Sequence, residues 1–353
     1  MHPILFEIPL PAFAEPWLGD TLPIFSYGVM LGTSFILAWY IVMELGERDG
    51  IHRDVLANAF IVAALSAIVG SRVLYIATNP DEFDTVVSWF ALRRGGLVAY
   101  GGFLGGFVGS LIYLRRAKVP LLRFADVTAP TLALGLAFTR IGCYLYGCDF
   151  GAPLSDDAPD WLQGWGTFPH WDNDEGSPAW SHHVMEYGLE PEAGYSLPVH
   201  PTQLYESAAG FTLVAITFFV WTRRQFHGQV LFVLTMSYGI WRFLIEYVRD
   251  DPERGEAFGF STSQLISLAL VPIAGFFYWQ RWTEHKKKPV PVYHLGGTPH
   301  PVPQLALAGA AAGGRKSSSA SAADDEEDER PAGTSSTKKP TRQGGKPGKK
   351  KRR

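Results

Sequence analysis

Seven apolar stretches separated by polar connections constrain this chain more than any other feature. Each stretch is about 20 residues long, which is the length a helix needs to cross a bilayer core. Within lipid, a helix satisfies every backbone donor and acceptor without water. We therefore predict an all-α integral membrane protein with about seven transmembrane helices, at residues 23–44, 55–77, 96–114, 125–146, 203–222, 229–248 and 263–282.

The placement of Lys and Arg between the stretches predicts their orientation, because basic residues are retained on the cytoplasmic side. The connections after the first, third and fifth stretches and the segment after the seventh are basic. Residues 148–202, in contrast, hold no Lys or Arg in 55 positions and ten Asp and Glu. The predicted topology has the N-terminus outside and the C-terminus in the cytoplasm.

These patterns divide the chain into five parts. Residues 148–202 are too long for a structureless loop, so we expect a small extracytoplasmic cap between the fourth and fifth spans. The end of the chain is rich in Ala, Gly, Ser and charge and cannot bury a core, so we expect disorder there. The parts are an extracytoplasmic arm at 1–22, spans at 23–147, the cap at 148–202, spans at 203–282 and a cytoplasmic tail at 283–353.

The chain has two cysteines, Cys143 and Cys148. Two are too few for a disulfide framework or for a zinc site of known spacing. They can pair only if the helix ends between them; otherwise they are two small apolar residues. The histidines of residues 148–202 lack a metal-ligand spacing, and we expect no metal.

Five ionisable residues stand out inside the apolar stretches. Each costs about 2.5–3.5 kcal/mol at mid-bilayer on insertion scales, so such a residue indicates function by default. All five should face the interior of the bundle. Mutual Arg–Glu pairing is the structural alternative for the two glutamates. The five are Arg72, Arg140, Glu206, Arg242 and Glu246.

The sixth stretch carries a polar stripe. At 100° per residue, Tyr238, Arg242, Glu246 and Arg249 fall within an arc of roughly 80°. Arginine reads phosphate through its bidentate fork. Arg140 should lie at a similar depth, and two arginines facing one cavity repel each other unless an anion lies between them. We expect that anion to be a lipid phosphate.

Two further features lie at the outward ends of stretches. Tyr100 precedes Gly101 and Gly102, whose lack of side chains permits close approach by a neighbouring backbone or a ligand. Helix packing alone also explains these glycines. His200 stands at the water–lipid boundary before Pro201, which suits a first helical turn. A structural role for His200 is the alternative to a catalytic one.

Taken in order, these segments resemble the prolipoprotein diacylglyceryl transferase family, over about residues 20–282. Each motif is short, and the order on a chain with seven spans makes the resemblance specific. The matching segments are Ser26-Tyr27-Gly28, Gly70-Ser71-Arg72, Gly101-Gly102, Arg140-Ile141-Gly142, His200 to Glu206, and the stripe from Tyr238 to Arg249.

The resemblance implies an enzyme that transfers the diacylglyceryl group of phosphatidylglycerol to the lipobox cysteine thiol of a preprolipoprotein. The products are a thioether and glycerol 1-phosphate, and no metal or organic cofactor is needed. The implied partners are phosphatidylglycerol, preprolipoprotein lipobox peptides and membrane lipids, with no nucleic acid. The implied location is the bacterial inner (cytoplasmic) membrane, as a multi-pass protein.

The resemblance also assigns roles to residues of this chain. Arg242, Tyr238, Tyr100 and Glu246 are the expected catalytic residues, with Glu246 holding an arginine in place. A second set is expected to bind phosphatidylglycerol. It comprises Arg140, Tyr27, Arg72, Gly101, Gly102, Gly151, His200, Glu206 and Arg249.

The chain departs from the family pattern in two places. Tyr100 stands where the family has a histidine that is a candidate base, and Cys143, Tyr146 and Cys148 replace Asn, Asn and Glu. Tyrosine, with a pKa near 10, is a poor base at neutral pH. Three explanations stay open: a base elsewhere, activation of the thiol by the arginines alone, or a divergent paralogue with another acceptor. Alternative functions are a non-catalytic phospholipid-binding paralogue and an anion or lipid transporter that uses the same cavity.

Overall fold

The computed structural model divides the chain into two units, residues 1–304 and 305–353. The second unit lies outside the described residues, as does the predicted tail from residue 290 onward. All described helices, strands and side chains belong to the first unit. The described residues are 3–10, 20–83, 85, 88–89, 95–171, 176–250 and 256–289.

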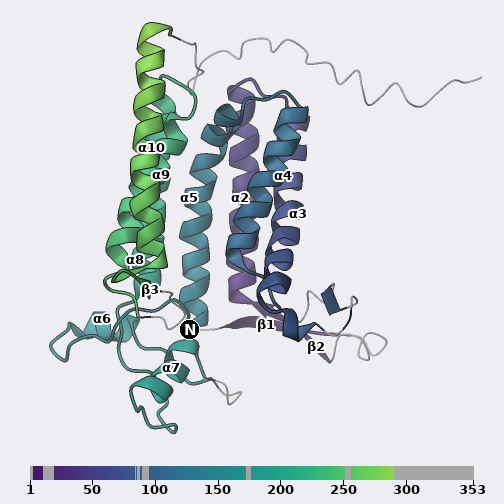
Figure 1. The fold of residues 1–353 in the computed structure, drawn as a ribbon. Helices are drawn as coiled ribbons and strands as arrows, with labels where there is room; N and C mark the ends of the chain where they lie inside the picture. The colour runs from purple at the N-terminus through teal and green to yellow at the C-terminus, as the bar shows by residue number, and fades with distance from the viewer. Residues whose placement is uncertain are drawn as a thin grey trace, which may run out of the picture. The chain divides into compact units, whose positions relative to one another are not determined.

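The described chain is mostly helical, and one helix lies on each predicted apolar stretch (Figure 1). These helices are α2 (Ser26–Arg48), α3 (Arg53–Thr78), α4 (Ala99–Arg116), α5 (Leu121–Tyr146), α8 (Thr202–Arg223), α9 (Gln229–Ile245) and α10 (Thr262–Lys287).

Five of these helices are long and apolar enough to cross a membrane, namely α2, α3, α5, α8 and α10. Helix α9 is apolar but has 17 residues. Helix α4 is not among the five, because five glycines and two terminal arginines lower its hydropathy. The protein is therefore an integral membrane protein of mostly helical fold, as predicted.

Helix α5 is the centre of the packing. It lies against α2, α8 and α9, and α9 in turn packs on α10. The core between these helices is aliphatic, with Leu56, Val127, Ala133 and Val230 almost completely buried. Large apolar side chains on the outer faces of α2, α3, α4 and α10 are exposed, as expected for surfaces that contact lipid.

Helices α3 and α4 pack closely along their length (Figure 1). A Cβ atom on Gly101 would overlap the carbonyl oxygen of Gly70, and one on Gly105 would overlap that of Ser66. Small residues at such an interface let two backbones meet, which is how helices associate in lipid. The glycines of α4 therefore serve helix packing, the alternative that the sequence left open.

Two short hairpins add to the predicted all-α fold. Strand β1 (Ile4–Pro9) pairs antiparallel with β2 (Thr21–Phe25), and β3 (Glu256–Ala257) pairs with β4 (Phe260–Ser261). The first hairpin lies partly in the predicted arm, and β2 runs directly into α2. The first helix consequently begins at Ser26 rather than at residue 23, because Pro23 lies in a strand.

The described part of residues 148–202 folds around a small core of its own. It contains α6 (Asp160–Trp165) and α7 (Pro178–Glu186), which lie where α5 ends and α8 begins (Figure 1). Its core consists of Phe150, Phe168, Ala179 and Val199. The backbone donors of Ser196 and Val199 bond to the carbonyls of Phe168 and Gly166. The side of the membrane on which this segment lies stays a prediction.

We predict that Gly105→Leu destabilises the bundle by about 1–3 kcal/mol, the usual cost of overpacking. The new side chain would force α4 away from α3. Thermal unfolding of the purified protein in detergent measures the loss. Gly32→Leu is the matched control, because nothing lies within 4 Å of a Cβ at Gly32. Equal unfolding temperatures for the two variants would contradict the packing role of Gly105.

We also predict that the 148–202 segment loses stability on mild acidification. Burial, followed by the neighbouring His182, lowers the pKa of His183 to about 4, and its Nδ1 accepts a hydrogen bond from the Leu197 N–H. Unfolded histidine titrates near 6.5. Stability is therefore constant above about pH 6.5 and falls between 6.5 and 4, where only the unfolded state takes up the proton. His183→Asn should flatten this pH profile of thermal unfolding; an unchanged profile would refute the assignment.

Candidate active site

One buried carboxylate, that of Glu206, holds three guanidinium groups. Glu206 lies in the second turn of α8 with its side chain 1% exposed. Its Oε1 is 3.4 Å from Nη1 of Arg242 and 3.3 Å from Nη1 of Arg249, and its Oε2 contacts Nε of Arg140. Because Arg140 comes from α5 and Arg242 from α9, this carboxylate joins three helices.

Asp149 is a second carboxylate in the same cluster. Its Oδ2 is 2.9 Å from Nη1 of Arg140, and its Oδ1 contacts Nη2 of Arg249. Although burial acts against its charge, Arg140 and then Arg249 lower the pKa of Asp149 below its usual value. The Oγ1 of Thr202 donates to the Asp149 carbonyl over 2.7 Å, which ties the turn after α5 to the start of α8.

Asp149 reaches the arginines because α5 ends in a tight left-handed turn. Gly147 follows the last helical residue with φ of 86°, a conformation that glycine adopts without a steric penalty. Asp149 itself has φ of 59°, which is uncommon for any residue with a side chain and costs of the order of 1 kcal/mol. Two ion pairs and the Thr202 bond hold it there.

The predicted stripe on the sixth stretch is partly wrong. Helix α9 ends at Ile245, so Arg249 is not placed by helical periodicity. The chain turns after Ile245, and Arg249 forms an antiparallel bridge with Gly151. This bridge carries Arg249 to the cluster. Arg242 and Glu246 do pair as predicted, with 2.6 Å between Nη1 and Oε2, and Nη2 of Arg242 donates to Ser263 Oγ over 2.9 Å.

Three arginines and three carboxylates together form what we call the arginine cluster, whose formal charges cancel. Its members are Arg140, Arg242, Arg249, Glu206, Asp149 and Glu246. Glu206 supplies the negative charge that Arg140 and Arg242 need to lie near each other, so their proximity does not by itself require the expected lipid phosphate, whose binding stays a prediction.

Side-chain exposure separates the members of the cluster. Arg140 and Arg242 are 16% and 15% exposed, whereas Arg249 is 3% exposed. Arg249 also contacts both Glu206 and Asp149. The side chains of Arg140 and Arg242 are thus more accessible than that of Arg249, which supports the carboxylates that contact them.

A cavity of about 520 Å³ opens beside Asp149. The first turn of α2 lines it with Tyr27 and Gly28, which places the predicted Tyr27 close to the cluster. The remaining lining residues are Phe25, Cys143, Tyr146, Cys148 and Asp149. Tyr238 lies one turn before Arg242 on α9 and within electrostatic range of Glu206 and the three arginines. The structure therefore brings Tyr27 and Tyr238, two of the three predicted tyrosines, to the cluster.

Gly151 and His200 pack together beside the cluster. The N–H of Gly151 donates to the His200 carbonyl over 3.0 Å, and a Cβ at Gly151 would lie 2.6 Å from the Val248 carbonyl oxygen. Gly151 is therefore required for the approach that brings in Arg249. The His200 ring lies 3.4 Å from the Tyr205 hydroxyl, and burial lowers its pKa. No described hydrogen bond or ion pair joins the His200 ring to the arginines.

Arg72 lies apart from the cluster and orders a loop. Its guanidinium donates to the carbonyl oxygens of Ser88, Trp89, Gly95 and Gly96 at 2.8–3.0 Å. The ring of Phe83 lies 5.0 Å from its Cζ. These contacts hold the segment between α3 and α4 to α3, so the described contacts of Arg72 are structural.

Tyr100, Gly101 and Gly102 also lie on the α3–α4 side. Tyr100 is 58% exposed on the first turn of α4. Gly101 packs on Gly70, and Gly102 faces the hydroxyl of Ser71. Among the described residues, no hydrogen bond or ion pair joins Tyr100 to the arginine cluster. The catalytic role of Tyr100 stays a prediction.

Sequence reasoning missed Asp149 and a second buried charge cluster at the opposite end of α5. In that cluster the Asp49 carboxylate contacts Arg224 and lies 3.3 Å from Nε of Arg123. Asp126 accepts hydrogen bonds from the N–H groups of Gly228 and Val230 at the start of α9. An aspartate inside the fourth apolar stretch, Asp126, was the sequence signal that could have revealed this second cluster.

Comparison with known proteins places these residues in a family. The model of the prolipoprotein diacylglyceryl transferase family matches residues 17–280. The chain is 32% identical over 254 residues to phosphatidylglycerol–prolipoprotein diacylglyceryl transferase 2 of Clostridium perfringens, covering 71% of this chain and 88% of that protein. It is 27% identical over 278 residues to the corresponding transferase of Clostridium tetani, covering 79% of this chain and 97% of the relative.

The family match covers the helices on the seven predicted apolar stretches, from α2 to most of α10, together with every member of the arginine cluster. The resemblance inferred from the order of the motifs is thereby confirmed. The chain belongs to the prolipoprotein diacylglyceryl transferase family.

Proposed function

We propose that this protein transfers the diacylglyceryl group of phosphatidylglycerol to the lipobox cysteine thiol of a preprolipoprotein. The names of its relatives give phosphatidylglycerol as the donor and a prolipoprotein as the acceptor. The observation that carries the proposal onto this chain is the arginine cluster, in which Glu206 contacts Arg140 and Arg242 while both side chains stay partly exposed.

The reaction exchanges one bond for another. The thiolate sulfur attacks the glycerol carbon that bears the phosphate, forming the C–S bond of a thioether. The C–O bond to phosphate breaks, and its electron pair leaves with glycerol 1-phosphate. The thiol proton passes to a base. Because a phosphodiester with one negative charge becomes a monoester with up to two, charge develops on the departing phosphate.

Arg140 and Arg242 are suited to stabilise that charge. Fixed donors aimed at developing charge usually give the largest single contribution to catalysis, and the guanidinium fork matches two phosphate oxygens at once. Glu206, Asp149 and Glu246 together balance the charge of the three arginines before substrate binds, so the arginines are held in place without a ligand. Glu246 fixes Arg242, and Tyr238 can donate a hydrogen bond to the phosphate or the glycerol.

The proposed topology has seven crossings, with α4 and α9 as the two short ones. The N-terminus and residues 148–202 lie outside the cytoplasmic membrane of a bacterium, and the tail lies in the cytoplasm. This topology places the arginine cluster near the outer surface, where the phosphate of an outer-leaflet lipid lies. The division of the chain into five parts, at residues 1–22, 23–147, 148–202, 203–282 and 283–353, follows from the same topology.

We predict that Arg140→Ala and Arg242→Ala each lower transfer at least about 10²-fold, the usual cost of one lost charge-stabilising donor. Release of glycerol phosphate from phosphatidylglycerol by the purified protein and a lipobox peptide is the measurement. Arg281→Ala is the control, since Arg281 is half exposed and pairs only with Glu284 among the described residues. Arg242→Lys is a second variant for the case in which the alanine variant misfolds, because it keeps a positive charge beside Glu206.

Transfer by the wild-type protein is itself the test of the proposal. No glycerol phosphate released under conditions where a relative is active would indicate a phospholipid-binding paralogue. Full activity in both alanine variants would instead remove the arginines from the mechanism.

We predict that Tyr100→His raises the rate of transfer at neutral pH, if a base at this position limits the reaction. An unperturbed imidazole titrates near 6.5, whereas the phenol of tyrosine titrates near 10. The rate should then rise with pH through the imidazole pKa. Tyr100→Phe is the control, because it removes the hydroxyl and supplies no base. Equal rates for the His and Phe variants would show that position 100 does not hold the base.

A further inference from the structure

The two cysteines meet at the end of α5 because of the way that helix terminates. Gly147 donates its N–H to the Cys143 carbonyl over 2.8 Å, and Cys148 donates to the same carbonyl over 3.2 Å. The bond from Cys148 spans six residues, like the longer of the two bonds in a Schellman motif, and a contact between the residues at the ends of that span frequently accompanies such a turn. In this chain both end residues are cysteines.

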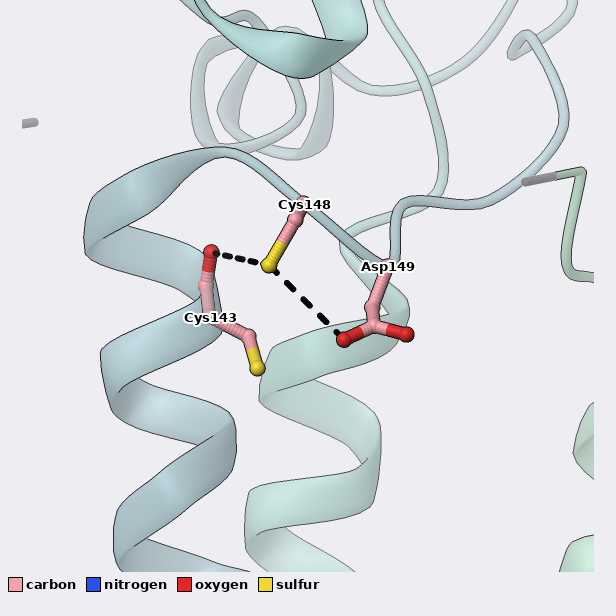
Figure 2. A group of neighbouring side chains, drawn as sticks. All are labelled: Cys143, Cys148 and Asp149. Carbon is pink, nitrogen blue, oxygen red and sulfur yellow. Dashed lines mark hydrogen bonds between the residues drawn. The ribbon is translucent and has the colours of Figure 1, made fainter. Parts of the chain in front are cut away.

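Figure 2 shows the two sulfur atoms on the side of the turn that faces Asp149. The sulfur atoms and a carboxylate oxygen of Asp149 lie within 4.8 Å of one another. The Cys148 sulfur is 3.9 Å from the Cys143 carbonyl oxygen and 3.7 Å from Oδ2 of Asp149. Both cysteines are thiols in the structure.

We propose that Cys143 and Cys148 are a redox pair that forms a reversible disulfide with a disulfide oxidant. The two thiols differ in access: Cys148 is partly exposed on the cavity beside Asp149, whereas Cys143 is 7% exposed. Cys148 is therefore the thiol that an oxidant reaches first, and Cys143 is the thiol that resolves the mixed disulfide.

The exchange balances without a metal. The Cys148 thiol loses its proton to solvent, and its sulfur attacks the external disulfide and expels one thiolate. The Cys143 sulfur, after losing its own proton, then attacks the mixed disulfide and expels the second. Two protein thiols become one disulfide, and the external disulfide is reduced to two thiols.

A cation bound by the same three side chains is less favourable. Both oxygens of Asp149 already face guanidiniums, those of Arg140 and Arg249, whose positive charge would repel a metal ion. A disulfide adds no charge. In the proposed topology the pair also faces the outside, where disulfides form and persist.

The disulfide would lock the turn that positions Asp149. Its peptide neighbours are already fixed, since Gln203 donates to the Cys148 carbonyl and Thr202 to that of Asp149, each over 2.7 Å. Linking Cys148 to α5 removes freedom from the unfolded turn and holds Asp149 at its unusual φ. The link would thus preserve the contact of Asp149 with Arg140, an effect on the proposed active site that rests on the proposed function.

Thiol counting tests the pair directly, because the chain has two cysteines. The full-length protein in detergent is treated with oxidised glutathione, alkylated with N-ethylmaleimide and weighed intact. The expected wild-type product has lost two hydrogen atoms and carries neither glutathione nor maleimide. Cys143→Ser should instead retain one glutathione on Cys148, because the resolving thiol is missing. The oxidised wild type should unfold at a higher temperature than the reduced form, and the double serine variant should not respond.

The proposal would be overturned if the wild-type protein kept glutathione on Cys148, or if both thiols still reacted with maleimide after the treatment. Protection of both thiols by Zn²⁺ but not by oxidised glutathione would overturn it in favour of a metal site. None of these readouts uses the transferase reaction, so a failure of the proposed function would leave the thiol result standing.

Discussion

The buried carboxylate of Glu206 is the interaction on which the outward end of the bundle depends. A carboxylate this deeply buried is stable only when it is paired and hydrogen-bonded, and three guanidiniums meet that need. In return, Glu206 joins α5, α8 and α9 at one point. Removing it would leave three arginines next to one another, so the helix packing and the chemistry share one residue.

The opposite end of α5 repeats this principle with other residues. Arg224 and Asp49 are fully buried and in contact, and Asp126 binds the N–H groups at the start of α9. Helix α5 thus carries a buried ionic anchor at each end. Two anchors fix both its depth and its rotation relative to α2, α8 and α9, which apolar packing in lipid alone would specify weakly.

Much of the fold was predictable because hydropathy reports directly on spans of helix length. The positions of seven helices and the inward placement of Arg140, Arg242 and Glu206 follow from the cost of charge in lipid, and the structure confirms them. The pairing of Glu246 with Arg242 was also expected, since the two are four residues apart on one face.

The parts that escaped prediction depend on turns rather than on periodicity. Asp149 enters the cluster through a left-handed backbone conformation, and Arg249 enters through a bridge to Gly151 after α9 has ended. A helical pattern describes one helix at a time and cannot show that Glu206, on another helix, lies between two arginines.

The partly exposed side chains of Arg140 and Arg242 are proposed to receive the phosphate of phosphatidylglycerol while Glu206 keeps both guanidiniums oriented. An experimental structure of the full-length protein with bound phosphatidylglycerol tests this central claim most directly. We expect phosphate oxygens within hydrogen-bonding distance of both guanidiniums, with the ion pairs of Glu206 intact. A headgroup bound away from both arginines, for instance near Arg72 between α3 and α4, would contradict the claim.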